Sequence, residues 1–146
     1  STLHTNDAAS AITRLQDMGL ESYLVSSTVV GIMAQRLVRR ICKQCRTEDT
    51  GSEELRDYFG LTADETFYRG SGCGECFNTG YKGRAMVGEI IEITSALREM
   101  ITRKPSAEEI RTLAIREGMT PLTQNALAMA RAGITTLEEV FSVKLE

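Results

Sequence analysis

The sequence lacks several features that whole classes of protein require. None of its 146 residues is tryptophan and only one is histidine, so few side chains can serve proton-transfer catalysis. No apolar run reaches the roughly 18 residues of a membrane-spanning helix, and residues 1–7 lack the basic-then-apolar order of a signal peptide. The formal net charge of −3 provides no overall cationic field for nucleic acid or anionic membranes. We therefore expect a soluble protein.

A phosphate-binding loop is also missing. The pattern Gly-x-x-x-x-Gly-Lys-Ser/Thr occurs nowhere, so the chain cannot hold a nucleoside triphosphate by that route. There is no initiator methionine, and a helical pattern begins within the first ten residues. We expect the chain to be part of a longer protein and to lack hydrolytic activity on its own.

Capping residues and apolar spacing predict a mixed α/β chain of the α+β kind. A helix capped by Asn6 or Asp7 ends at Gly19, and a short helix precedes a mostly buried strand over 32–38. A second strand is expected over 85–93. Three capped helices follow, with start and stop residues Ser106/Glu109 to Gly118, Thr120-Pro121 to Gly133, and Thr136/Glu139 onward. Their expected core residues are Ile110, Leu113, Ala114, Leu122, Leu127, Val140 and Phe141.

Four cysteines form two Cys-x-x-Cys pairs, Cys42/Cys45 and Cys73/Cys76, separated by residues 46–72. Each pair can place two thiolates on one side of a tight turn, and two pairs complete the tetrahedron that zinc accepts. The segment between them has few large apolar residues, so it needs a staple. Metal binding supplies on the order of 10 kcal/mol to such a module. We predict a structural zinc ion, because four sulfur ligands leave no open position for catalysis.

Two other interpretations of the cysteines remain. Disulfides are possible, although nothing in the chain indicates an oxidising compartment. A redox dithiol is also possible, although it would need only one pair. Both alternatives predict a site without metal.

Two further features are candidates for function. The basic run of residues 36–46 is set beside a segment holding six of the eight aromatic residues, which is typical of nucleic-acid contact. We favour a solvated edge or a subunit interface, because the whole chain is acidic. The run consists of Arg36, Arg39, Arg40, Lys43 and Arg46. His4 precedes the first helix, whose amides attract phosphate, although a lone histidine is more often structural.

Several motifs together resemble the secretion ATPases that drive type II secretion and type IV pilus assembly. Ser1-Thr2-Leu3-His4-Thr5-Asn6-Asp7-Ala8 resembles the family's histidine box. Ala34-Gln35-Arg36-Leu37-Val38-Arg39 is similar to its approach to a four-cysteine zinc module, and Thr79-Gly80-Tyr81-Lys82-Gly83-Arg84 to its exit. The resemblance continues through Arg14-Leu15-Gln16-Asp17-Met18-Gly19, Arg116-Glu117-Gly118-Met119-Thr120-Pro121-Leu122 and Gly133-Ile134-Thr135-Thr136-Leu137-Glu138-Glu139-Val140.

The resemblance implies the C-terminal part of a RecA-like ATPase domain, followed by a four-cysteine zinc module and a C-terminal helical bundle. Residues 1–41 would belong to the core, 42–82 to the zinc module, 83–94 to a returning core strand and 95–146 to a helical subdomain. His4 would approach the terminal phosphate of ATP, and Cys42, Cys45, Cys73 and Cys76 would hold zinc. ATP and magnesium would bind in the full-length protein, outside this segment.

The family resemblance also implies partners and a location. The full-length protein would be a cytoplasmic hexamer, peripheral to the inner membrane, that engages a membrane platform protein and a cytoplasmic domain of a secretion or pilus component. Nucleic acid would not be a ligand. Gln124-Asn125-Ala126 and Phe141-Ser142-Val143 depart from the family pattern, and Gln16-Asp17-Met18-Gly19 favours the secretion branch. The alternative function is a zinc-ribbon module that binds nucleic acid.

Overall fold

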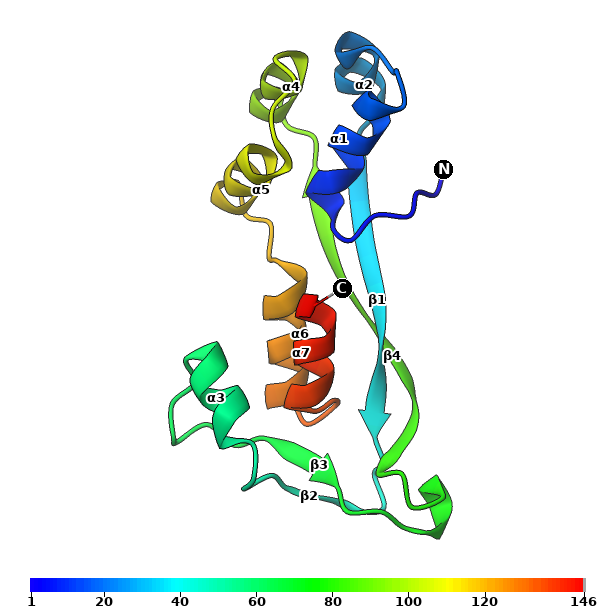
Figure 1. Ribbon diagram of the computed structural model, residues 1–146, viewed down its shortest axis with the longest axis vertical. Helices are drawn as coiled ribbons and strands as arrows, with labels where there is room; N and C mark the ends of the chain where they lie inside the picture. Colours follow the sequence, from blue (N-terminus) through cyan, green and yellow to red (C-terminus); the bar gives the residue numbers. More distant parts are fainter. Residues whose placement is uncertain (146) are drawn as a thin grey trace. The chain divides into compact units, whose positions relative to one another are not determined.

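The computed structural model describes residues 1–145, which fold into two compact units (Figure 1). The first unit contains Ser1–Gln35 and Gly88–Pro121, and the second contains Arg36–Val87 with the chain from Leu122 onward. Two strands, β1 (Gly31–Ile41) and β4 (Tyr81–Glu92), are hydrogen-bonded neighbours in a two-stranded sheet. Both strands begin in one unit and end in the other.

The first unit is mainly helical. It contains α1 (Ala8–Asp17), α2 (Ser22–Thr28), α4 (Ser95–Thr102) and α5 (Ala107–Arg116). Helix α2 packs on α4, and α1 packs on α5. Its buried side chains include Ile12, Ile91, Leu97, Ile101 and Ile110, which lie at the helical and strand spacings expected of core positions.

The second unit carries the cysteines. Strands β2 (Arg46–Glu48) and β3 (Tyr68–Gly70) form an antiparallel pair, joined through α3 (Glu53–Phe59). The 3₁₀ turn η1 (Gly74–Cys76) precedes β4, and α6 (Leu122–Arg131) packs on α7 (Leu137–Leu145). Phe67, Leu137 and Val140 are fully buried here.

The structure confirms the α+β class. The described residues form seven α-helices and two small sheets. The strand expected over 32–38 lies within β1, and the strand expected over 85–93 overlaps β4, which ends at Glu92. The capping box of Ser106 and Glu109 is present, and Asp7 caps α1 by accepting the N–H of Ser10 at 2.7 Å. Within residues 1–145, no helix is long and apolar enough to cross a bilayer. The RecA-like relationship and the four-part domain division stay predictions.

The expected burial of the strand over 32–38 is wrong. Ala34 and Val38 are buried, but Met33 is 53% exposed and Leu37 is 63% exposed. Successive side chains of a strand point to opposite faces. Within residues 1–145, the face with Ala34 and Val38 is covered and the face with Met33 and Leu37 is not. The segment is therefore a half-buried strand.

Candidate metal centre

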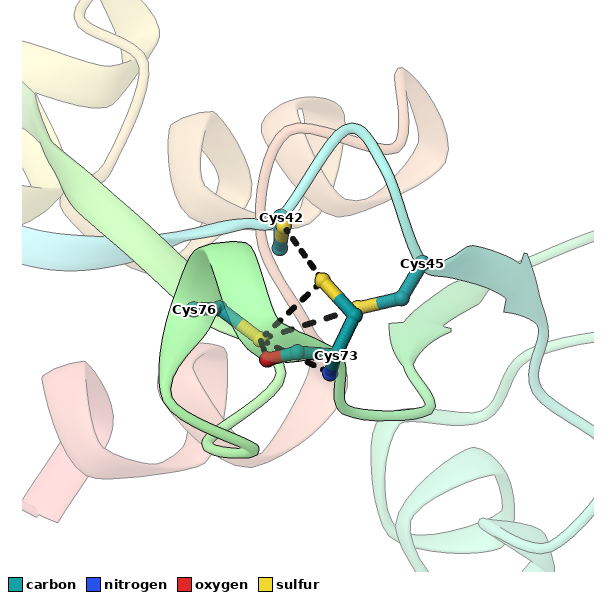
Figure 2. Close-up of side chains that lie close together, drawn as sticks. All are labelled: Cys42, Cys45, Cys73 and Cys76. Atoms are coloured by element: carbon teal, nitrogen blue, oxygen red, sulfur yellow. Dashed lines mark hydrogen bonds between the residues drawn. The ribbon is translucent and has the colours of Figure 1, made fainter.

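The four cysteines are brought together by two loops that meet at one end of β1 and β4. Cys42 and Cys45 follow the end of β1, and Cys73 and Cys76 frame the η1 turn (Figure 2). The loops are tied through backbone hydrogen bonds, because Cys42 N donates to Gly80 O at 2.9 Å and Ser71 N donates to Cys45 O at 2.9 Å. Two segments far apart in sequence thus present their side chains to a common centre.

The sulfur atoms form a compact cluster. The Sγ atoms of Cys42 and Cys73 are 3.8 Å apart, as are those of Cys45 and Cys76, and those of Cys73 and Cys76 are 3.7 Å apart. All four lie within 4.8 Å of one another, a spacing suited to one metal ion. A disulfide requires about 2.05 Å, so all four cysteines are free thiols here.

Backbone donors favour ionisation of one cysteine. Cys73 N and Gly80 N each donate to Cys76 Sγ at 3.3 Å. Burial acts to raise the pKa of Cys76, but these two N–H groups and the neighbouring thiols outweigh it and lower the pKa to about 6. Burial raises the pKa of Cys45 to about 11, and the neighbouring thiols add to this effect, whereas a backbone hydrogen bond from Gly72 opposes it. These contacts therefore favour the thiolate form of Cys76, which is the form that binds metal.

A glycine pair makes this loop geometry possible. A Cβ atom on Gly70 would lie 2.0 Å from the carbonyl oxygen of Gly80, far inside contact distance. Gly80 itself has φ +78°, in the left-handed region that favours glycine. Since Gly80 also contacts both Cys42 and Cys76, the close approach of these two glycines sets the distance between the cysteine loops.

The rest of the cysteine module has little apolar core of its own. Helix α3 buries none of its residues, and Phe67 is the one large apolar side chain buried between the cysteine pairs. Polar contacts replace packing, because Arg56 donates to the Glu65 carbonyl at 2.8 Å and lies over the Phe67 ring. Glu65 in turn pairs with Arg131 of α6 at 2.5 Å. The predicted need for a staple agrees with this sparse packing.

The structure places His4 outside the metal centre, as an exposed residue before α1. The amides at the start of α1 are occupied by carboxylates, because Ala8 N donates to buried Glu89 at 2.8 Å and Ser10 N donates to Asp7. A phosphate at this helix terminus would meet two negative groups. Two amides at the start of α1 thus already have carboxylate partners, whereas His4 itself is accessible, and its approach to a phosphate stays a prediction.

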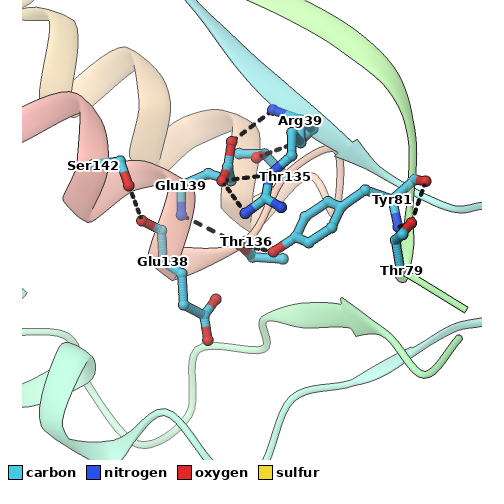
Figure 3. A network of polar contacts seen from close by, with 8 residues as sticks. All are labelled: Arg39, Thr79, Tyr81, Thr135, Thr136, Glu138, Glu139 and Ser142. Carbon is cyan, nitrogen blue, oxygen red and sulfur yellow. Dashed lines mark hydrogen bonds and ion pairs between the residues drawn. The ribbon is translucent and has the colours of Figure 1, made fainter.

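Only part of the basic run is available for partners. The Arg39 guanidinium donates to Glu139 at 2.9 and 2.8 Å and lies over the Tyr81 ring, 4.1 Å from its centroid (Figure 3). Hydrogen bonding to Glu139 raises the pKa of Arg39. Arg46 lies over the Tyr68 ring at 3.9 Å. Arg39 and Arg46 are thus engaged inside the unit.

The same network includes the predicted cap at the start of α7. Glu139 N donates to Thr136 Oγ1 at 3.3 Å, which is the expected first half of a capping box. The Glu139 carboxylate, however, accepts the backbone N–H of Arg39 at 2.7 Å. Tyr81 and Thr136 hydroxyls also contact at 2.9 Å (Figure 3). The start of α7 is thereby attached to the strands that lead into the cysteine loops.

Sequence reasoning missed several residues around the centre. Gly70 belongs to no motif, Gly80 has no role in its motif beyond the family resemblance, and the sequence indicates only a local cap for Glu139. Lys82 and Arg84 were read only as part of a family motif, yet they line the same hollow as Arg40. The available signal is that each strand adjoins a cysteine pair, because β1 ends just before Cys42 and β4 begins shortly after Cys76.

Comparison with known proteins gives a consistent result. The chain matches the type II/IV secretion system protein family over residues 1–142. It is 43% identical over 150 residues to the type IV pilus assembly ATPase PilB of Thermus thermophilus, covering 100% of this chain and 17% of the relative. It is 40% identical over 148 residues to the type II secretion system ATPase E of Vibrio cholerae, covering 100% of this chain and 29% of the relative.

A third relative extends the range of systems. The type II secretion system protein HxcR of Pseudomonas aeruginosa is 38% identical over 143 residues, covering 98% of this chain and 27% of the relative. The chain therefore spans less than a third of the length of each of these relatives. The match runs through the histidine segment, both cysteine pairs and the C-terminal helices, in order. The chain belongs to the type II/IV secretion system protein family.

Proposed function

We propose that this chain is the C-terminal region of an ATPase that powers assembly of a type II secretion pseudopilus or a type IV pilus. The observation that carries the proposal is the unbroken similarity, at 43% and 40% identity, to one region of two proteins named as such ATPases. In this assignment the phosphate-binding loop, ATP and magnesium belong to the rest of the protein.

The four cysteines would hold one structural zinc ion. A tetrahedron with zinc–sulfur distances of about 2.3 Å has edges of about 3.8 Å, and the observed sulfur separations of 3.7 and 3.8 Å fit that figure. Four thiolates leave no position for water or substrate, so the ion would brace the loops and take no part in chemistry. Cys76 would be the first ligand, because its thiolate is already stabilised.

His4 would contact a nucleotide that is bound by the rest of the protein, outside this segment. Its exposure leaves it accessible to a phosphate held by other parts of the protein. Since Asp7 and Glu89 occupy the start of α1, the phosphate would be held elsewhere and His4 would only contact it. The proposal extends to a hexamer on the cytoplasmic face of the inner membrane that works with a platform protein.

Hydrolysis assays test whether ATP turnover requires the part of the protein that lies outside this chain. The 146-residue chain should show no ATP turnover, because it contains no phosphate-binding loop. Appreciable hydrolysis by the purified chain would overturn the proposal. Sequencing the gene upstream of His4 gives a second test, since a phosphate-binding loop should be encoded there.

Metal analysis tests the zinc assignment independently. Freshly reduced protein should contain one zinc per chain, and chelation should expose the amides of residues 42–80 to hydrogen exchange while α5 stays protected. Well under one equivalent of zinc would count against the assignment.

The alternative of a nucleic-acid-binding zinc ribbon has less support. Arg39 and Arg46 of the basic run are engaged with Glu139, Tyr81 and Tyr68. Binding through phosphate contacts weakens steeply with added salt, so titration of single-stranded DNA at low salt separates the two functions. The ATPase assignment predicts negligible binding.

A further inference from the structure

A hollow with an excess of positive charge lies beside the cysteine loops. It has a volume of about 460 Å³, and four cationic side chains line it, with Cys42 and one carboxylate also on its wall. The cations come from β1, the first cysteine turn and β4, and are Arg40, Lys43, Lys82 and Arg84. We call this site the basic hollow.

Most of these charges have no partner within the protein. Lys82 pairs with Glu75 at 2.6 Å, which is the carboxylate on the wall. Across residues 1–145, no ion pair or hydrogen bond engages the side chains of Arg40, Lys43 or Arg84. Like charges gathered in a concave site repel one another and focus a positive potential outward. The remainder of the basic run, by contrast, includes Arg39 and Arg46, which are held by neighbours.

The metal centre does not account for the excess. Four thiolates with a divalent ion would carry a net charge of −2, and Cys42 belongs to both the centre and the hollow. Lys82 is already balanced by Glu75. The three remaining cations still exceed that negative charge, so an external anion would be attracted.

We propose that the basic hollow binds an acidic segment of a partner protein, whose carboxylates project between Arg40, Lys43 and Arg84. A concave site accepts projecting side chains, whereas a flat bilayer surface cannot follow its walls. None of the lining residues is aromatic, so the hollow offers no platform for nucleobase stacking. Two arginines suit carboxylates, because the guanidinium can donate two parallel hydrogen bonds to one carboxylate.

This inference deepens the proposed function and rests on it in one respect. An assembly ATPase must transmit its cycle to other proteins, and the hollow supplies a contact for that purpose. Its position at the ends of β1 and β4, beside the cysteine loops, means that a bound segment would lie against a braced part of the unit. The charge arrangement itself stands without the assignment.

Fluorescence anisotropy with a labelled hexaglutamate peptide tests the proposal on the zinc-loaded chain. The peptide should bind at low salt and dissociate as salt screens the charges. Replacing Arg40, Lys43 and Arg84 together by Gln should weaken binding roughly tenfold or more, and each single change by about two- to fivefold. The matched control is R14Q/R69Q/R116Q, which removes the same charge from exposed cations outside the hollow and should retain most of the affinity.

Zinc content, measured in every variant, ensures that lost binding does not reflect a lost metal centre. Failure of hexaglutamate to bind at low salt would overturn the proposal, as would equal losses in the two triple variants. Tighter binding of single-stranded DNA or anionic vesicles through the same three residues would assign the hollow to another class of partner. None of these results bears on ATP turnover, so the proposed function is judged separately.

Discussion

Replacement of Gly70 by alanine should disrupt the cysteine centre without touching a cysteine. The new Cβ would lie 2.0 Å from the carbonyl oxygen of Gly80, 2.5 Å from its Cα and 2.6 Å from its carbonyl carbon. All three are backbone atoms, so relief requires the two segments to separate by more than about 1 Å, given carbon contact distances near 3.5 Å. That movement pulls Gly80 away from its hydrogen bonds to Cys42 and Cys76.

The expected magnitude follows from these contacts. Overpacking costs about 1–3 kcal/mol, and each lost hydrogen bond adds about 1 kcal/mol. With two hydrogen bonds lost, a total near 3–5 kcal/mol would lower zinc affinity by between roughly 100-fold and several thousandfold. Competition against a chromophoric zinc chelator measures this directly.

Gly74→Ala is the matched control. Residue 74 lies between Cys73 and Cys76, close to Gly70 in the same loop, and its Cβ would meet no atom within 4 Å. Its zinc affinity should stay near that of the unsubstituted chain, because open positions tolerate alanine within about 0.5 kcal/mol. If Gly70→Ala bound zinc within a factor of about three of this control, a difference of only about 0.7 kcal/mol, the account of the glycine contact would be wrong.

Three other predictions concern single side chains. In metal-free, reduced protein, thiolate absorbance should show a step near pH 6 that Cys76→Ser removes and Cys45→Ser leaves. Because the pKa of Cys76 is lowered from 9.0 to about 6, ionisation of Cys76 should raise the free energy of unfolding between pH 6 and pH 9. The pKa of Cys45 is raised to about 11, so the free energy of unfolding should fall again above pH 9. Thermal melts across this pH range measure both effects. His4→Ala in the full-length ATPase should lower kcat by at least about 10²-fold with no change in zinc content or melting temperature, and unchanged turnover would remove His4 from the mechanism. Glu139→Gln should cost about 1–3 kcal/mol in urea unfolding, since the nearly buried Glu139 carboxylate accepts hydrogen bonds from the backbone N–H and the guanidinium of Arg39. Glu99→Gln, in an exposed i,i+4 pair, should cost under about 0.5 kcal/mol.

Local signals in the sequence predicted much of this fold. The Asp7 cap, the Gly19 stop and the Ser106–Glu109 box each depend on residues within a few positions of one another, and the structure contains all three. The two Cys-x-x-Cys spacings similarly predicted four sulfur atoms around one centre. A single sequence predicts such features because the residues that form each of them lie within about four positions of one another.

Two buried carboxylates could not be anticipated in this way. Glu89 is 3% exposed, and its partner is the N–H of Ala8, 81 residues away. Glu139 accepts from Arg39, 100 residues away. A single sequence shows both as ordinary polar positions, because the donor that satisfies each one is supplied only by the tertiary fold.

The glycine contact and the basic hollow have the same origin. Gly70 and Gly80 approach through backbone atoms, and no residue pattern encodes that distance. Arg40 and Arg84 are far apart in sequence and share one wall only because β1 and β4 are neighbours. The sequence predicts the four cysteines of the candidate centre but not the residues that position them.

X-ray absorption spectroscopy at the zinc edge tests the central claim most directly. A single zinc ion bound by Cys42, Cys45, Cys73 and Cys76 predicts a first shell of four sulfur atoms at about 2.3 Å with no oxygen or nitrogen. A shell containing light atoms, or fewer than four sulfurs, would contradict the proposal that these loops enclose a structural metal.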